Sequence, residues 1–149
     1  KGRFLEEEKL GNLVVNCSCG VYGYAAKNKA PQGQPAVVAM RQQIKTGKAQ
    51  ILACVDGTPK LYDCKVESVQ LKDDSTMQNM VIEITDKKLL EQTGGIVQGM
   101  SGSPVLQNGM LIGAVTHVFV NDPTRGYAIF AENMLSETQS LTKNLKKVS

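Results

Sequence analysis

Apolar residues along the chain fall in short runs rich in Val, Ile, Leu and Tyr, which frequent Gly and Pro residues separate. Runs of this length, bounded by turn-forming residues at short intervals, are typical of an all-β sandwich or barrel. The pattern predicts strands over residues 13–16, 21–25, 36–40, 49–55, 61–71, 80–85, 104–107, 110–120 and 126–130. Asn108 and Gly109, between the seventh and eighth of these, form the strongest hairpin signal in the chain.

Two segments depart from the strand pattern. Residues 86–92 read D-K-K-L-L-E-Q and predict a short helical turn that ends at Gly94 and Gly95. From Glu132 onward, apolar residues recur at intervals of seven, four and three, which places them on one stripe of a helix: Met134, Leu141, Leu145 and Val148. We therefore expect a mainly β protein, a barrel with a C-terminal helix packed on its outside, and an exposed loop over residues 27–34.

The composition is that of one globular domain and indicates no strongly charged partner. The 149 residues suffice to bury a core, 42% of them are hydrophobic, and 17 basic against 14 acidic residues leave a net charge of +3. Lys143, Lys146 and Lys147 suit the negative end of a closing helix, so we expect no nucleic-acid partner. No apolar run reaches the roughly 18 residues of a membrane span, and we expect no stable span in this chain.

The four cysteines and the single histidine do not form a metal pattern. Cys17 and Cys19 are too close for a zinc knuckle, and His117 is the only histidine, so neither a metal site nor a cofactor is expected. Cys54 and Cys64 flank the turn signal at residues 56–59 and are predicted to face each other across a hairpin. A disulfide between them and two free thiols are equal alternatives at this point.

The chemistry of the chain centres on the glycine-rich stretch G-G-I-V-Q-G-M-S-G-S-P at residues 94–104. Glycines on both sides of Ser101 allow the sharp bend that a nucleophilic hydroxyl needs and let a substrate carbonyl approach. The same bend can aim the amides of Gly99 and Ser101 at one point, an oxyanion hole that contributes about 3 kcal/mol per donor. On the pattern alone, a tight corner of the barrel without catalysis explains these residues equally well.

The order of the parts around Ser101 resembles the active-serine region of chymotrypsin-like peptidases. There, G-D-S-G-G-P is followed by a hairpin whose second strand lines the specificity pocket, and here G-M-S-G-S-P is followed by a predicted hairpin that carries Thr116 and His117. The resemblance implies the C-terminal barrel of a two-barrel peptidase, with Thr116 and His117 in contact with substrate. A half-buried structural role is the alternative for His117. Met100 departs from the usual Asp, so trypsin-like specificity is not expected.

A closer resemblance is to the SpoIVB peptidase family of spore-forming bacteria. It rests on T-G-G-I-V-Q-G-M-S-G-S-P at residues 93–104, I-G-A-V-T-H-V-F-V-N-D-P-T at 112–124 and M-L-S-E at 134–137. The resemblance implies an exported serine peptidase of sporulation that acts in the space between forespore and mother cell. Such peptidases cleave themselves and a regulator of a membrane-embedded protease, so that a late sigma factor is released.

Carried over position by position, the resemblance implies that Ser101 is the nucleophile and that Asp86, fifteen residues before it, is the catalytic acid. Helix capping is the alternative role for Asp86, which lies between a predicted strand and a helical turn. The family's catalytic histidine lies in the first barrel, after a short glycine-rich strand, and nothing in this chain matches it. We therefore expect residues 1–149 to be the serine-bearing part of the peptidase domain, with most of the first barrel and the histidine upstream.

Two functions follow from these observations. The first is a serine endopeptidase fragment that forms an acyl-enzyme at Ser101 and acts on proteins or peptides, itself included. This fragment is expected to be inactive by itself because it lacks the histidine. The second is a protease-fold domain that binds peptides or partners without cutting them.

Overall fold

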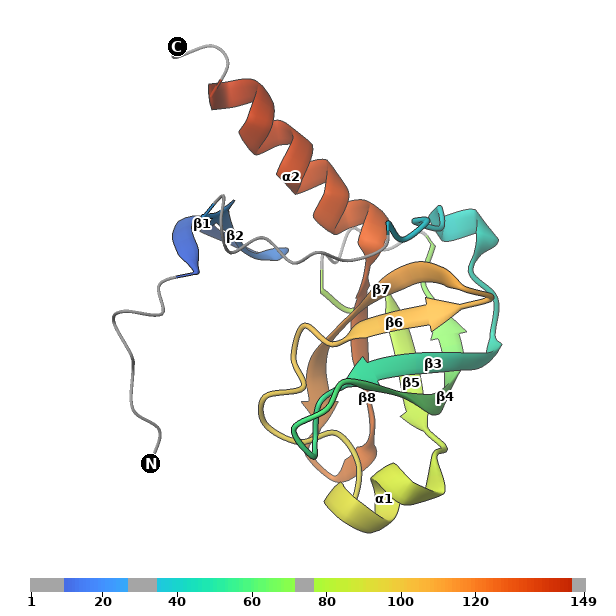
Figure 1. Ribbon diagram of the computed structural model, residues 1–149. Coiled ribbons are helices and arrows are strands. Elements are labelled where there is room, and N and C mark those ends of the chain that lie inside the picture. Colours follow the sequence, from blue (N-terminus) through green and yellow to red (C-terminus); the bar gives the residue numbers. More distant parts are fainter. Residues whose placement is uncertain (1–9, 27–34, 72–76, 146–149) are drawn as a thin grey trace.

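The computed structural model describes residues 10–26, 35–71 and 77–145, and its main feature is a closed six-stranded barrel (Figure 1). In chain order the elements are β1 (Gly11–Cys17), β2 (Gly20–Ala25), the 3₁₀ turn η2 (Arg41–Gln43), β3 (Gly47–Ala53), β4 (Lys60–Val69), β5 (Met80–Ile84), α1 (Lys87–Thr93), β6 (Pro104–Gln107), β7 (Met110–Phe119), β8 (Asp122–Phe130) and α2 (Ala131–Leu145). The strands of the barrel follow the order β3-β4-β5-β8-β7-β6, and every pair of neighbours is antiparallel.

Alternating side chains of the strands fill the barrel. In β4, Tyr62, Cys64 and Val66 point inward and are buried, while the residues between them are exposed. This period of two is the one that the sequence pattern indicates, because successive side chains of a strand point to opposite faces of the sheet. The most deeply buried large side chains of the barrel come from all six of its strands: Phe130, Ile51, Met80, Ile82, Ile84, Ile112, Val66, Val105 and Val115. The predicted fold class, a β-barrel with a C-terminal helix, is confirmed.

The hairpin of β1 and β2 lies outside the barrel and packs beside α2 (Figure 1). Its buried residues Cys19 and Tyr22 share a small apolar cluster with Ala114 of β7 and Ile129 of β8. Two members of the predicted helical stripe, Met134 and Leu141, pack against the same cluster. The expected position of the C-terminal helix on the outside of the barrel is therefore confirmed, and the side chains of Leu145 and Val148 lie outside the described residues.

Local sequence signals correctly predicted the two ends of α1 and the turn between β6 and β7. The side chain of Asp86 caps α1 by accepting a hydrogen bond from the Leu89 amide, and Gly94 ends the helix in the left-handed conformation. Asn108 and Gly109 have φ of 53° and 76°, the left-handed pair that a two-residue hairpin of this kind requires. The loop predicted over residues 27–34 lies outside the described part of the chain.

The predicted strand over residues 36–40 is wrong. This segment makes one isolated parallel bridge, between Val38 and Leu111 of β7. The segment lies on the edge of β7 that also pairs with β8, because β6 occupies the other edge. The β7–β8 ladder begins with Gly113 and Phe130, after which the chain turns into α2. Only the residues of β7 before Gly113 can therefore pair with the segment, and Val37 and Met40 remain exposed.

The predicted opposition of Cys54 and Cys64 is also wrong. Cys64 lies opposite Ala49, and the last pair of the β3–β4 ladder joins Ala53 to Lys60. Residues 54–59 form the loop of this hairpin. The midpoint of the β3–β4 pairing therefore lies near Asp56, and not at Pro59 as the opposition of Cys54 and Cys64 would require. Cys54 is exposed, Cys64 is buried, and all four cysteines are free thiols. Burial raises the pKa of the Cys64 thiol to about 12.

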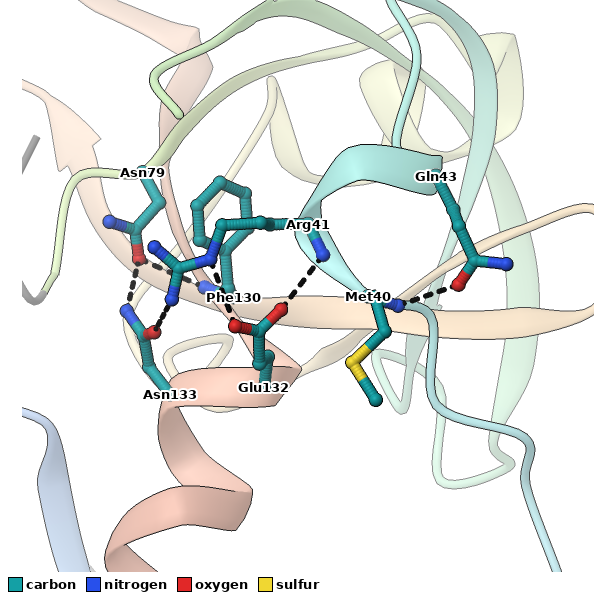
Figure 2. A network of polar contacts seen from close by, with 7 residues as sticks. All are labelled: Met40, Arg41, Gln43, Asn79, Phe130, Glu132 and Asn133. Atoms are coloured by element: carbon teal, nitrogen blue, oxygen red, sulfur yellow. Dashed lines mark hydrogen bonds and ion pairs between the residues drawn. The ribbon is translucent and has the colours of Figure 1, made fainter. Parts of the chain in front are cut away.

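A polar network joins η2 and α2 to the end of the barrel (Figure 2). The Arg41 backbone amide and its Nε atom donate to the two carboxylate oxygens of Glu132, each at 2.9 Å, and Arg41 Nη2 donates to Asn133 at 2.9 Å. Asn133 donates in turn to Oδ1 of the fully buried Asn79 at 3.1 Å. The same Oδ1 accepts the Phe130 amide at 3.0 Å, and thus holds the point where β8 becomes α2.

No helix in the described ranges combines the length and the apolar character needed to cross a membrane. Among the same residues there is no group of three or more His, Cys, Asp and Glu side chains arranged to hold a metal ion.

Candidate active site

The loop that carries the serine begins at the end of α1 and is fixed first to β8. Gly95 has φ of 138°, and a Cβ atom there would collide with the backbone carbonyl of Pro123. The close approach lets the Ile96 amide donate to the Pro123 carbonyl at 2.7 Å. Only glycine fits at position 95, for reasons of both backbone conformation and space.

A buried methionine anchors the bend of the serine loop. Met100 is 4% exposed, its amide donates to the Val97 carbonyl at 3.1 Å, and its carbonyl accepts from the Ser103 amide at 3.0 Å. Gly99 and Gly102, on either side, have φ of 96° and 88°. The side chain between the two glycines is thus held in the core while the next residue, Ser101, points outward.

Two backbone hydrogen bonds attach this bend to β7. The Gly102 amide donates to the Val115 carbonyl at 2.8 Å, and the Val115 amide donates to the Ser103 carbonyl at 3.0 Å. Ser101 is exposed, and its Oγ atom donates to the backbone carbonyl of Thr116 at 3.1 Å. The hydroxyl therefore has a defined resting position against the strand that was predicted to contact substrate.

The two predicted oxyanion donors have no partner within the described protein. Neither the Gly99 amide nor the Ser101 amide donates a backbone hydrogen bond among the described residues. Free amides in a glycine-flanked bend, next to an exposed hydroxyl, are the arrangement that can receive a developing oxyanion.

An open cleft of about 540 Å³ lies beside the serine. One wall is the loop that contains Gly99 and Ser101, and the other is the end of β3 with the residues after it, including Cys54 and Val55. No local signal in the sequence marks this second wall, because the pairing of β3 with β6 is what brings residues so far apart in the chain to one place.

Thr116 and His117 lie on β7 at an irregularity of its ladder with β8, where the register shifts between Val115 and His117. The Thr116 hydroxyl donates to the carbonyl of Met77 at 2.7 Å, and its own carbonyl accepts from Ser101. His117 is exposed, and no hydrogen bond joins it to Ser101 in the described structure. Neither Thr116 nor His117 lines the cleft, so their contact with substrate stays a prediction.

Asp86 serves as a helix cap and does not line the cleft. Its Oδ1 accepts the Leu89 amide at 3.0 Å and its Oδ2 accepts the Asp63 amide at 3.3 Å. The hydrogen bond from Leu89, together with that from Asp63, holds the pKa of this carboxyl below its usual range. The capping role is thereby confirmed, and the role of triad acid stays a prediction.

A barrel of this topology with a glycine-flanked serine bend belongs to the chymotrypsin-like serine proteases in fold. Solved structures support this class. The active form of the Rv3671c protease from M. tuberculosis superimposes with a TM-score of 0.60 at 18% identity, over 85% of this chain and 55% of that one. An inactive form of the same protease gives 0.60 at 18% identity, over 87% and 66%. The HtrA-type protease AlgW with a decapeptide gives 0.59 at 16%, over 89% and 40%.

The sequence profile of the SpoIVB peptidase S55 family matches residues 1–135, and the chain belongs to this family. The predicted family is confirmed. No curated protein matches the chain. At 16–18% identity the solved structures establish the fold alone, and the chain spans 40–66% of their length.

Proposed function

We propose that this chain is the serine-bearing part of an exported serine endopeptidase that works through an acyl-enzyme at Ser101. The observation that carries the proposal is the bend itself: an exposed Ser101 hydroxyl at the mouth of a cleft, beside the unpaired amides of Gly99 and Ser101. Attack by Oγ on a peptide carbonyl would place the new oxyanion near these amides. A base must take the hydroxyl proton and later give it to the leaving amine.

The proposal assigns the base to a histidine outside residues 1–149, in the first barrel of the longer protein. His117 is the only histidine of this chain and makes no hydrogen bond to Ser101 in the described structure. In the same proposal Asp86 orients that histidine in addition to capping α1, since each carboxylate oxygen has two acceptor positions. Family membership supports a role in sporulation signalling between forespore and mother cell, by cleavage of the protein itself and of a regulator of a membrane-embedded protease.

A second candidate function is peptide binding without cleavage. It is favoured by one observation, the resting hydrogen bond of Ser101 to a backbone carbonyl with no imidazole hydrogen-bonded to the hydroxyl. In that case the cleft would hold a peptide or partner and Ser101 would serve only the bend.

Labelling with a fluorophosphonate separates the two functions. In a longer form that includes the upstream histidine, Ser101 should be labelled stoichiometrically, Ser101→Ala should abolish labelling and self-cleavage, and Ser103→Ala should retain both. The 149-residue chain should react only slowly, because loss of a triad base costs on the order of a millionfold in turnover. Two results would contradict the peptidase proposal. One is a Ser101→Ala variant of the longer form that is still labelled, and the other is an unmodified longer form that is not labelled at all.

A further inference from the structure

The pairing between β3 and β6 ends beside the loop that carries Ser101. β3 pairs with β4 from Gly47 to Ala53, but it pairs with β6 only at Gln50 and Ile51. Beyond Ile51, no strand among the described residues lies on that second edge of β3. Alternate residues of a strand direct their N–H and C=O groups to the same side, so the end of β3 presents backbone groups that no strand pairs.

This free edge of β3 lies in the cleft that holds the serine. Leu52, Ala53 and the following Cys54 and Val55 line it, opposite the loop with Ser101. The strand β6 cannot extend its pairing toward the cleft, because it begins at a proline, which has no amide hydrogen to donate. An extended segment from another molecule can therefore lie along the edge of β3 without displacing any strand.

The walls of this cleft carry no charge. None of the lining residues is Asp, Glu, Lys, Arg or His, and Leu52, Val55 and Val97 give it apolar surface. Next to the cleft, Asp56 of the loop after β3 forms an ion pair with Lys60, the first residue of β4. A charged side chain that entered would lose its hydration without gaining a partner, which is unfavourable.

We propose that this cleft binds an extended peptide with uncharged, apolar side chains, which adds as a strand to the free edge of β3 beside Ser101. The proposal names the substrate class of the proposed peptidase and in that sense rests on it. Binding in this mode does not require cleavage, so the two can be tested apart.

Cys54 supplies a direct measure of occupancy in the unmodified chain. It is an exposed thiol in the cleft, whereas Cys64 is buried and Cys17 lies on the separate β1–β2 hairpin. The alkylation rate of Cys54 by iodoacetamide, followed by mass spectrometry of its tryptic peptide, should fall when a peptide fills the cleft. The rate at Cys17 should stay constant and serves as the internal control.

The probes are capped hexapeptides in a matched set. The first alternates Val and Ser, the second has Glu and the third Lys in place of Val, and the fourth repeats the first with alternate backbone amides methylated. At about ten times its Kd, the first peptide should slow alkylation of Cys54 about tenfold, since the free fraction falls as one plus the ratio of concentration to Kd. The other three should leave the rate unchanged over the same concentrations.

A pair of protein variants tests the role of charge. Val97→Glu places a carboxylate on a cleft residue that is 38% exposed, and it should weaken protection by the Val peptide and give the Lys peptide about fivefold higher affinity. Val120→Glu is the matched control, because Val120 is 96% exposed and lies outside the cleft, and it should change neither peptide.

Each outcome bears on the proposal separately from the peptidase activity. Equal protection by the Val, Glu and Lys peptides would overturn the preference for uncharged side chains, and equal protection by the methylated peptide would overturn strand addition. No protection by any peptide would overturn the site. Failure of fluorophosphonate to label Ser101 in the longer form would refute the peptidase and leave a positive peptide result standing.

Discussion

Asn79 allows the sharpest test of how the barrel is held to its C-terminal helix. It is fully buried, and its Oδ1 accepts both the Phe130 amide at 3.0 Å and the Asn133 side chain at 3.1 Å (Figure 2). Asn79→Ala leaves the Phe130 amide buried without a partner, which costs about 1–3 kcal/mol. The emptied volume adds to this loss, so the free energy of unfolding should fall by about 2–4 kcal/mol in total.

The assay is urea and thermal unfolding followed by far-UV circular dichroism. For a chain of this size each kcal/mol lowers Tm by about 2–4 °C, so the expected decrease is about 5–15 °C. Asn121→Ala is the matched control, since Asn121 is exposed in the turn between β7 and β8 and should change stability by less than about 0.5 kcal/mol. If the two variants lost the same stability, Asn79 would not be the partner that keeps the Phe130 amide satisfied.

Two further predictions concern the serine loop and the cap of α1. Gly95→Ala should lower the free energy of unfolding by about 2–4 kcal/mol, because it adds a collision with the Pro123 carbonyl to backbone strain. Gly94→Ala has open space around its new methyl group and should lower it by about 1 kcal/mol. Equal urea midpoints for the two variants would contradict this. Asp86→Ala should cost about 1 kcal/mol at neutral pH and Asp86→Asn only a few tenths. Hydrogen bonds, first of all that from the Leu89 amide, lower the pKa of Asp86 in the folded protein. The stabilisation by Asp86 is therefore present above the pKa of the unfolded chain and is lost as pH falls through the folded pKa. If the free energy of unfolding of Asp86→Asn fell with pH over the same range as that of the unmodified protein, the result would count against the cap.

The parts of the fold that the sequence predicted are those with local causes. Asn108 and Gly109 adopt left-handed conformations that few other residues tolerate, and Asp86 caps a helix three residues before the amide it accepts. The strand pattern of β4 followed from alternation alone. In each case the signal and the structure that it specifies lie within a few residues of each other.

The errors and omissions have the opposite character. Residues 36–40 have the composition of a strand, but β7 has only its first residues free for them, which depends on where β8 ends. The second wall of the cleft depends on barrel closure, through pairs such as Ile51 with Val105. The serine motif predicted a bend and its free amides, but no local pattern could indicate that the end of β3 would face it.

The resting hydrogen bond of Ser101 can be weighed against the need for a base. To react, the hydroxyl must leave the Thr116 carbonyl, and a neutral hydrogen bond of this kind contributes about 0.5–1.5 kcal/mol net. Breaking it lowers a rate by about tenfold at most. The base of a catalytic triad is worth on the order of a millionfold, so the contact with Thr116 is no barrier to catalysis once an imidazole is present. The activity of this site therefore depends on the residue that accepts the Ser101 proton far more than on the resting position of the hydroxyl.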